Sequence, residues 1–84
     1  MQTPASETIV PPARQRAAAL QQARQDALVV LPDISRKTGY GIADLIRLET
    51  GQVEVSPHAY AKITSAIEEL VGEREHRYSG AAAR

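Results

Sequence analysis

The chain has 84 residues with ten acidic and ten basic side chains, enough for one small domain with a formal net charge of zero. It contains 14 alanines but no Phe, Trp or Cys, which excludes a large aromatic core, a disulfide framework and a thiolate zinc site. No apolar run approaches the length of a signal sequence or a membrane span. We therefore expect a thin helical core and, by default, a cytoplasmic location without membrane contact.

The charges are distributed unevenly. Between Ala13 and Arg47 there are six basic and three acidic residues, a local charge of +3. Between Leu48 and His76 there are two basic and six acidic residues, a local charge of −4. This asymmetry favours contact with phosphate through a local basic patch. The alternative is that these charges only cover solvated helix faces.

The first predicted helix follows a polar lead-in, residues 1–11, which we expect to be disordered. The helix is predicted from about Pro12 to Ala27, because proline suits a first turn and the segment is rich in alanine, glutamine and arginine. Its apolar stripe consists of Ala13, Ala17, Leu20, Ala23, Ala27 and Leu28.

Two short helices are predicted next, over Pro32–Thr38 and Ile42–Glu49, joined by the turn Gly39-Tyr40-Gly41. Gly39 falls where a helix end usually enters the left-handed region, and Ser35 is small enough for a close helix crossing. The apolar residues that would hold two crossing helices together are Ile34, Tyr40, Leu45 and Leu48. This pattern predicts a helix-turn-helix, a motif that presents its second helix to the major groove of DNA.

Gly51 is predicted to end the second helix of the motif as its C-cap. The last predicted helix begins at Ser56-Pro57, an N-cap hydroxyl followed by a proline. It runs to about Val71, with Gly72 ending it, and its apolar face consists of Tyr60, Ile63, Ile67 and Leu70. The sequence thus predicts an all-α fold, a small bundle of four or five helices containing a helix-turn-helix. The domain would span residues 12–72, and residues 73–84 would form a flexible tail or a short extra helix.

The stretch LQQARQDALVVLPDISRKTGYGIADLIRLETG resembles the lambda-repressor-like (Cro/Xre-type) helix-turn-helix family. The residues that carry this resemblance are Leu20, Arg24, Ser35, Gly39-Tyr40-Gly41, Leu45, Leu48, Glu49 and Gly51. The following stretch, VEVSPHAYAKITSAIEEL, is similar to the corresponding part of LacI-type regulators. Leu31 and Pro32 depart from the Cro/Xre-type pattern, which often has polar residues there. Both resemblances imply DNA binding.

The resemblance implies a set of DNA contacts. The base contacts would come from Ile42, Ala43, Asp44 and Arg47, and the backbone contacts from Arg36, Lys37, Thr38 and Gly41. Arg47 suits guanine or phosphate, Ile42 and Ala43 suit thymine methyl groups, and Asp44 suits a cytosine amino group. Asp44 and Arg47 could instead pair with each other, and Thr38 could make a helix-end hydrogen bond. In similar proteins Glu49 pairs with the arginine of the first helix, here Arg24.

We expect a sequence-specific transcriptional repressor that binds double-stranded DNA as a homodimer on an inverted repeat, in a bacterial, phage or plasmid context. The alternative is a helix-turn-helix protein-interaction module, such as an antitoxin or a polymerase-binding adaptor, which the acidic last helix favours. An enzyme is not expected, because no nucleophile–base pair or phosphate-binding loop is present. The two histidines, His58 and His76, lack partners for a metal site, so no metal or cofactor is expected. A chain of this size leaves no room for an effector domain, so no small-molecule effector is expected.

Overall fold

The computed structural model describes residues 10–82, with side chains described for residues 10–77. Over this part of the chain it is all-helical and contains four helices: α1 (Ala13–Ala27), α2 (Leu31–Thr38), α3 (Ile42–Glu49) and α4 (Pro57–Ala82). The predicted fold class is thus confirmed, and the first three helices begin within one residue of their predicted starts. Most of the predicted lead-in, residues 1–9, lies outside the described residues.

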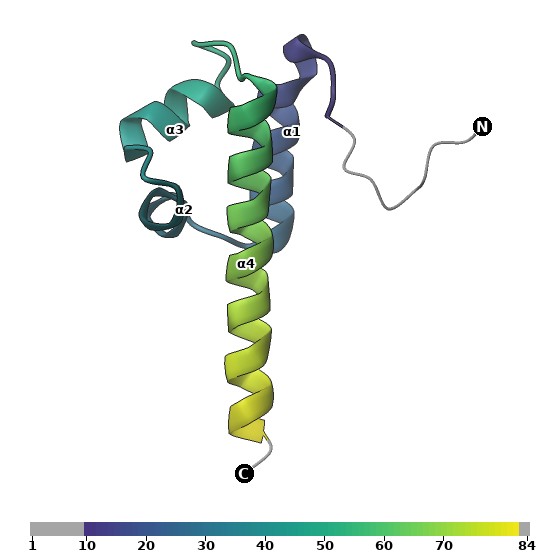
Figure 1. Ribbon diagram of the computed structural model, residues 1–84, viewed down its shortest axis with the longest axis vertical. Helices are drawn as coiled ribbons and strands as arrows, with labels where there is room; N and C mark the ends of the chain where they lie inside the picture. Colours follow the sequence, from purple (N-terminus) through teal and green to yellow (C-terminus); the bar gives the residue numbers. More distant parts are fainter. Residues whose placement is uncertain (1–9, 83–84) are drawn as a thin grey trace, which may run out of the picture.

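The helices α1 and α4 lie side by side, and α2 and α3 pack on one side of this pair (Figure 1). The core lies where the four helices meet. Its fully buried side chains come from three helices and from the connection that follows α3: Leu20, Ile34, Leu45 and Val55. From α4, Ile63 and Ile67 complete this core, and the other two residues of the predicted apolar face, Tyr60 and Leu70, are partly buried against it.

The two glycines that end α2 and α3 adopt the left-handed backbone that their positions require. Gly39 has a φ of 85°, and the Ser35 hydroxyl donates a 2.6 Å hydrogen bond to the Tyr40 carbonyl, which fixes the turn. Gly51 has a φ of 79° and follows α3, whose end is closed by a hydrogen bond from the Gln52 N–H to the Arg47 carbonyl (2.9 Å). These contacts fix the direction in which α3 leaves the turn.

The expected end of the last helix at Val71 is wrong, because α4 continues through Gly72 to Ala82. Residues 73–82 are therefore neither a separate helix nor a tail in this structure, and residues 83–84 lie outside the described part. A glycine inside a helix costs only about 1 kcal/mol relative to alanine. In addition, the Arg74 guanidinium donates hydrogen bonds to the carbonyls of Ala27 (2.9 Å) and Leu28 (3.4 Å), which link α4 to the end of α1.

The apolar stripe predicted for the first helix is correct from Ala17 to Ala27 and wrong at its two ends, Ala13 and Leu28, which are exposed. Leu20 is buried, and Ala17, Ala23 and Ala27 pack against the core. Leu28 lies beyond the helix end with a left-handed backbone (φ 57°) and a side chain that is 80% exposed. The chain reverses at this residue and turns toward α2, so the helical spacing no longer applies to it.

Candidate nucleic-acid interface

The helix α3 buries one side and exposes the other. Leu45, Leu48 and Glu49 lie on the buried side, toward the rest of the domain. The side chains of residues 42–44, together with those of Ile46 and Arg47, are exposed. In Figure 1, α2 and α3 lie at the edge of the molecule, and no other labelled helix covers their outer side. All four predicted base-contact residues, Ile42, Ala43, Asp44 and Arg47, are thus on the exposed side of one helix.

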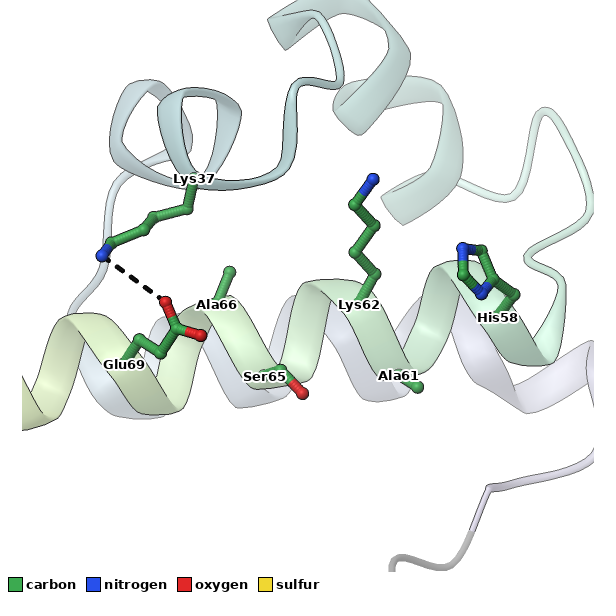
Figure 2. A pocket seen from close by; sticks show the side chains of 7 residues that line it. All are labelled: Lys37, His58, Ala61, Lys62, Ser65, Ala66 and Glu69. Carbon is green, nitrogen blue, oxygen red and sulfur yellow. Dashed lines mark ion pairs between the residues drawn. The ribbon is translucent and has the colours of Figure 1, made fainter.

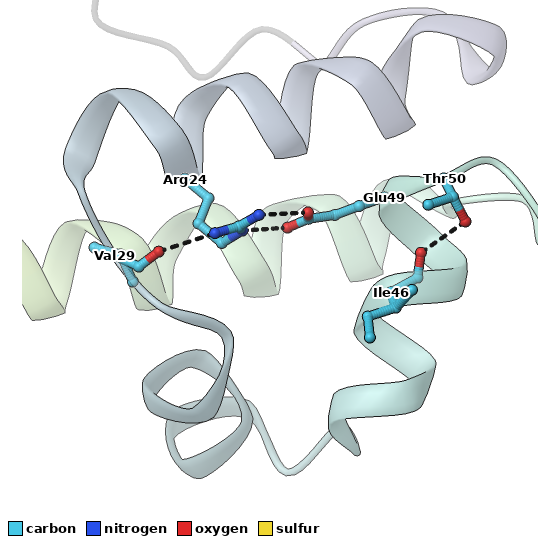
Figure 3. Close-up of polar contacts among 5 residues, drawn as sticks. All are labelled: Arg24, Val29, Ile46, Glu49 and Thr50. Carbon is cyan, nitrogen blue, oxygen red and sulfur yellow. Dashed lines mark hydrogen bonds and ion pairs between the residues drawn. The ribbon is translucent and has the colours of Figure 1, made fainter.

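An ion pair fastens the back of α3 to α1 (Figure 3). Arg24 Nε lies 2.7 Å from Glu49 Oε2, and Arg24 Nη2 lies 3.0 Å from Glu49 Oε1. The third nitrogen, Nη1, donates to the Val29 carbonyl at 3.2 Å. The hydrogen bond with Glu49 raises the pKa of Arg24 above its ordinary value. The Arg24–Glu49 pairing implied by the family resemblance is confirmed.

On the exposed side of α3, Asp44 and Arg47 form an ion pair with an O–N distance of 2.7 Å. Both side chains are about half exposed, and pairs of this kind contribute only about 0–1 kcal/mol. In the free chain these two residues thus adopt the mutual pairing that the sequence left open. Because the pair is weak, either group remains able to exchange its partner for a base or a phosphate.

The two cations of α2 are also paired with carboxylates. Arg36 lies 2.9 Å from Asp33 on its own helix. Lys37 reaches across to α4, where it pairs with Glu73. Its Nζ also lies 3.5 Å from a carboxylate oxygen of Glu69 (Figure 2). The hydrogen bond between Lys37 and Glu73 raises the pKa of the lysine and lowers that of the carboxyl. The basic and acidic residues that are segregated along the sequence are therefore not segregated in space, because acidic side chains of α4 lie beside the cations of α2.

Two of the residues predicted to contact the DNA backbone, Thr38 and Gly41, differ in exposure: Thr38 is buried and Gly41 is exposed. Thr38 is only 7% exposed, and its hydroxyl donates to the Ile34 carbonyl (2.8 Å) and accepts from the Tyr40 N–H (3.2 Å). This is the helix-end role, and burial leaves Thr38 unsuited to touch a phosphate. Gly41 is exposed and is the N-cap of α3, where no side chain caps the helix. Its position leaves the first N–H groups of α3 open to an acceptor.

Three features of this surface were not predicted. Ile46 is 43% exposed on α3, and its i,i+4 spacing from Ile42 could have revealed it. Val53 is 44% exposed in the loop after α3. A shallow groove of about 450 Å³ lies along α4, beside Lys37 of α2. It is lined by Lys37, His58, Ala61, Lys62, Ser65, Ala66 and Glu69 (Figure 2).

Other kinds of site find little support in the described residues. Within residues 10–82, no three His, Asp or Glu side chains gather in a way that could hold a metal ion. None of the described helices has the length and apolar character needed to cross a bilayer. Comparisons with protein-family models, with curated proteins and with solved structures found no match.

Proposed function

We propose that the chain is a sequence-specific DNA-binding transcriptional repressor that inserts α3 into the major groove. The observation that carries this proposal is the asymmetry of α3. Its back is fixed by Leu45, Leu48 and the Arg24–Glu49 pair, while its outer side chains are exposed. A helix held rigidly from behind, with short and branched side chains in front, suits the major groove, which admits an α-helix.

In this proposal the exposed cations exchange carboxylates for DNA groups. Arg47 leaves Asp44 to donate two hydrogen bonds to guanine, and Asp44 accepts from a cytosine amino group. Arg36, Lys37 and the first N–H groups of α3 contact phosphate. Breaking these exposed pairs costs little, because solvent screens them. The same pairs weaken the attraction to any DNA, so sequence-specific contacts would supply an unusually large share of the affinity.

A single α3 covers only a few base pairs, so we propose that the chain binds an inverted repeat as a homodimer. Half-site centres would then lie about 34 Å apart, one turn of the duplex. Occupying such a site within a promoter would exclude polymerase. Sedimentation equilibrium of the chain with its selected duplex should give two chains per site, and one chain per site would contradict the dimer.

The function is tested by selecting duplexes from a random library with the full chain. Enrichment of a common sequence with two-fold symmetry supports a repressor, and the absence of any enriched sequence contradicts it. Circular dichroism of the same sample ensures that the chain is folded during the selection.

Arg47→Ala and Lys37→Ala should weaken binding in different ways. Arg47→Ala removes a bidentate base contact, so it should cost about 1–3 kcal/mol on the selected duplex and relax the preference at one position of each half-site. Lys37→Ala removes a phosphate contact, so it should weaken binding to all duplexes alike. Anisotropy titrations with selected and random duplexes measure both effects. Equal losses on all duplexes for both variants would remove Arg47 from the base contacts.

The second candidate is a protein-interaction module, and the exposed aliphatic residues on and after α3 favour it. Ile42, Ile46 and Val53 are each 43–44% exposed, so a partner protein that covered them would bury aliphatic surface. The carboxylates beside Lys37 would also weaken phosphate binding. A folded chain that enriches no duplex would favour this candidate over the repressor.

A further inference from the structure

The exposed side of α3 is divided into an aliphatic half and an ionic half. Successive helical residues are turned by about 100°. Ile42 and Ile46 therefore lie together along one edge, and Ala43 lies between them and the Asp44–Arg47 pair on the other edge. Ile42 and Ile46 are each 43% exposed, whereas Leu45 and Leu48 are buried behind them. The free chain thus carries a strip of large aliphatic side chains along the helix proposed to enter the groove.

The strip is held in a fixed shape. In a helix, an isoleucine side chain strongly prefers one χ1 rotamer, so little freedom is lost when it is covered. The Thr50 hydroxyl donates a 2.8 Å hydrogen bond to the Ile46 carbonyl and so supports the last turn of α3 (Figure 3). The Arg24–Glu49 pair fastens the same turn to α1. Ile46 therefore lies in a part of the helix that these contacts hold in place.

In the major groove, the apolar group that such a strip can cover is the C5 methyl of thymine. Ile42 and Ile46 are separated by about 6 Å along the helix axis. Base pairs are about 3.4 Å apart, so the two side chains would reach different base pairs. Arg47, on the other edge of the helix, would meet a different position again.

We propose that Ile46, together with Ile42, determines specificity by contacting thymine methyl groups at two base pairs of each half-site. This inference rests on the proposed DNA binding. It adds Ile46 to the residues that contact bases and names the group that it recognises. The half-site should therefore contain at least two thymines that the protein distinguishes from uracil, although uracil makes the same hydrogen bonds.

The test uses the full chain and the duplex selected from the random library. Each thymine is replaced in turn by deoxyuridine, which removes only the methyl group, and affinity is measured by anisotropy. At a contacted thymine we expect about a four-fold loss, the value that corresponds to about 0.8 kcal/mol per buried carbon group. In Ile46→Ala this loss should disappear at one thymine and persist at the other, and Ile42→Ala should do the reverse. Leu28→Ala, which truncates an exposed aliphatic side chain that follows α1 and lies outside the proposed interface, should retain both losses.

The outcomes separate this inference from the proposed function. If a duplex is enriched but no deoxyuridine replacement weakens binding, DNA binding stands and the thymine contact is overturned. The same holds if the loss is unchanged in Ile46→Ala. If no duplex is enriched, the proposed function fails and this inference fails with it. If Ile46→Ala shows reduced helicity, Ile46→Val is used in its place. In Ile46→Val, replacing the same thymine by deoxyuridine should cost less affinity than in the original chain. An unchanged loss of affinity would overturn the contact.

Discussion

At the scale of single residues, the ion pairs of this chain differ in what they do. Arg24 and Glu49 are mostly buried and bidentate, and together they fix α3 to α1. Removing one partner of such a buried pair leaves the other charge uncompensated, which is strongly destabilising. Arg36, Lys37 and Arg47 instead pair with acids at the surface, where the pairs contribute little to stability. The exposed pairs therefore control which charges are available to a ligand.

Glu73→Gln should strengthen binding to random duplex, because it releases Lys37 from its main partner on α4. We expect an increase in affinity of about two- to five-fold at low salt, consistent with the modest strength of exposed pairs. Anisotropy measures it, and the increase should be much smaller in a Lys37→Ala background. If the increase is the same in that background, it reflects the change in net charge alone, and the masking of Lys37 is refuted.

The pH dependence of the Lys37–Glu73 pair follows from the pKa of the carboxyl. Lys37 lowers the pKa of Glu73 below its ordinary 4.5, so the pair is fully present above that value. It is lost as the pH falls through the lowered pKa of the folded chain. Lys37 thus stays paired with Glu73 throughout the neutral pH range, and a small drop in pH within that range does not break the pair.

At the scale of elements, local sequence signals located the helix starts and the turns. Gly39 ends α2 as expected, and the Ser56 hydroxyl caps α4 by accepting from the Ala59 N–H at 3.0 Å. These signals act over a few residues, so they can be recognised in the sequence. The continuation of α4 beyond Val71 could not be recognised in the sequence, because Gly72 suggested that the helix ends there. The contact that ties this part of α4 to α1 joins Arg74 to Ala27, 47 residues earlier.

The candidate site was predictable to a similar degree. Which α3 residues are exposed follows from helical spacing, and only Ile46 was overlooked. The pairing of Lys37 with Glu73 joins residues 36 positions apart on two helices and depends on how α4 lies against α2. No pattern within α2 contains that information. For Thr38 the sequence left two roles open, a phosphate contact and a helix-end hydrogen bond, and the structure shows the second.

Two glycine substitutions should have opposite effects on stability. Gly72 lies inside α4, and an added Cβ would meet nothing within 4 Å, so Gly72→Ala should stabilise the fold by about 0.5–1 kcal/mol. Gly51 has a φ of 79°, so Gly51→Ala should destabilise it by about 1 kcal/mol despite equally open space. Urea unfolding monitored by circular dichroism measures both. A destabilised Gly72→Ala variant would contradict a continuous α4.

At the scale of the whole molecule, stability depends on a small core that α4 completes. Ile67 is 6% exposed in the single chain, so it belongs to this core and not to a surface that only a second copy would cover. Ile67→Ala should cost about 2–5 kcal/mol, a large share of the stability of so small a domain. We expect a lower thermal midpoint and loss of DNA binding without any loss of a DNA contact. An unchanged midpoint would place Ile67 outside the core.

The most direct test of the central claim is the salt dependence of binding to two duplexes, one selected by the chain and one random. The proposed function predicts that the selected duplex binds at least about 10³-fold more tightly. For both duplexes, the logarithm of affinity should fall linearly with the logarithm of salt, by about 0.9 for each phosphate contacted. Equal affinities for the two duplexes, or an affinity that does not change with salt, would contradict the account of α3 as a helix that recognises DNA sequence.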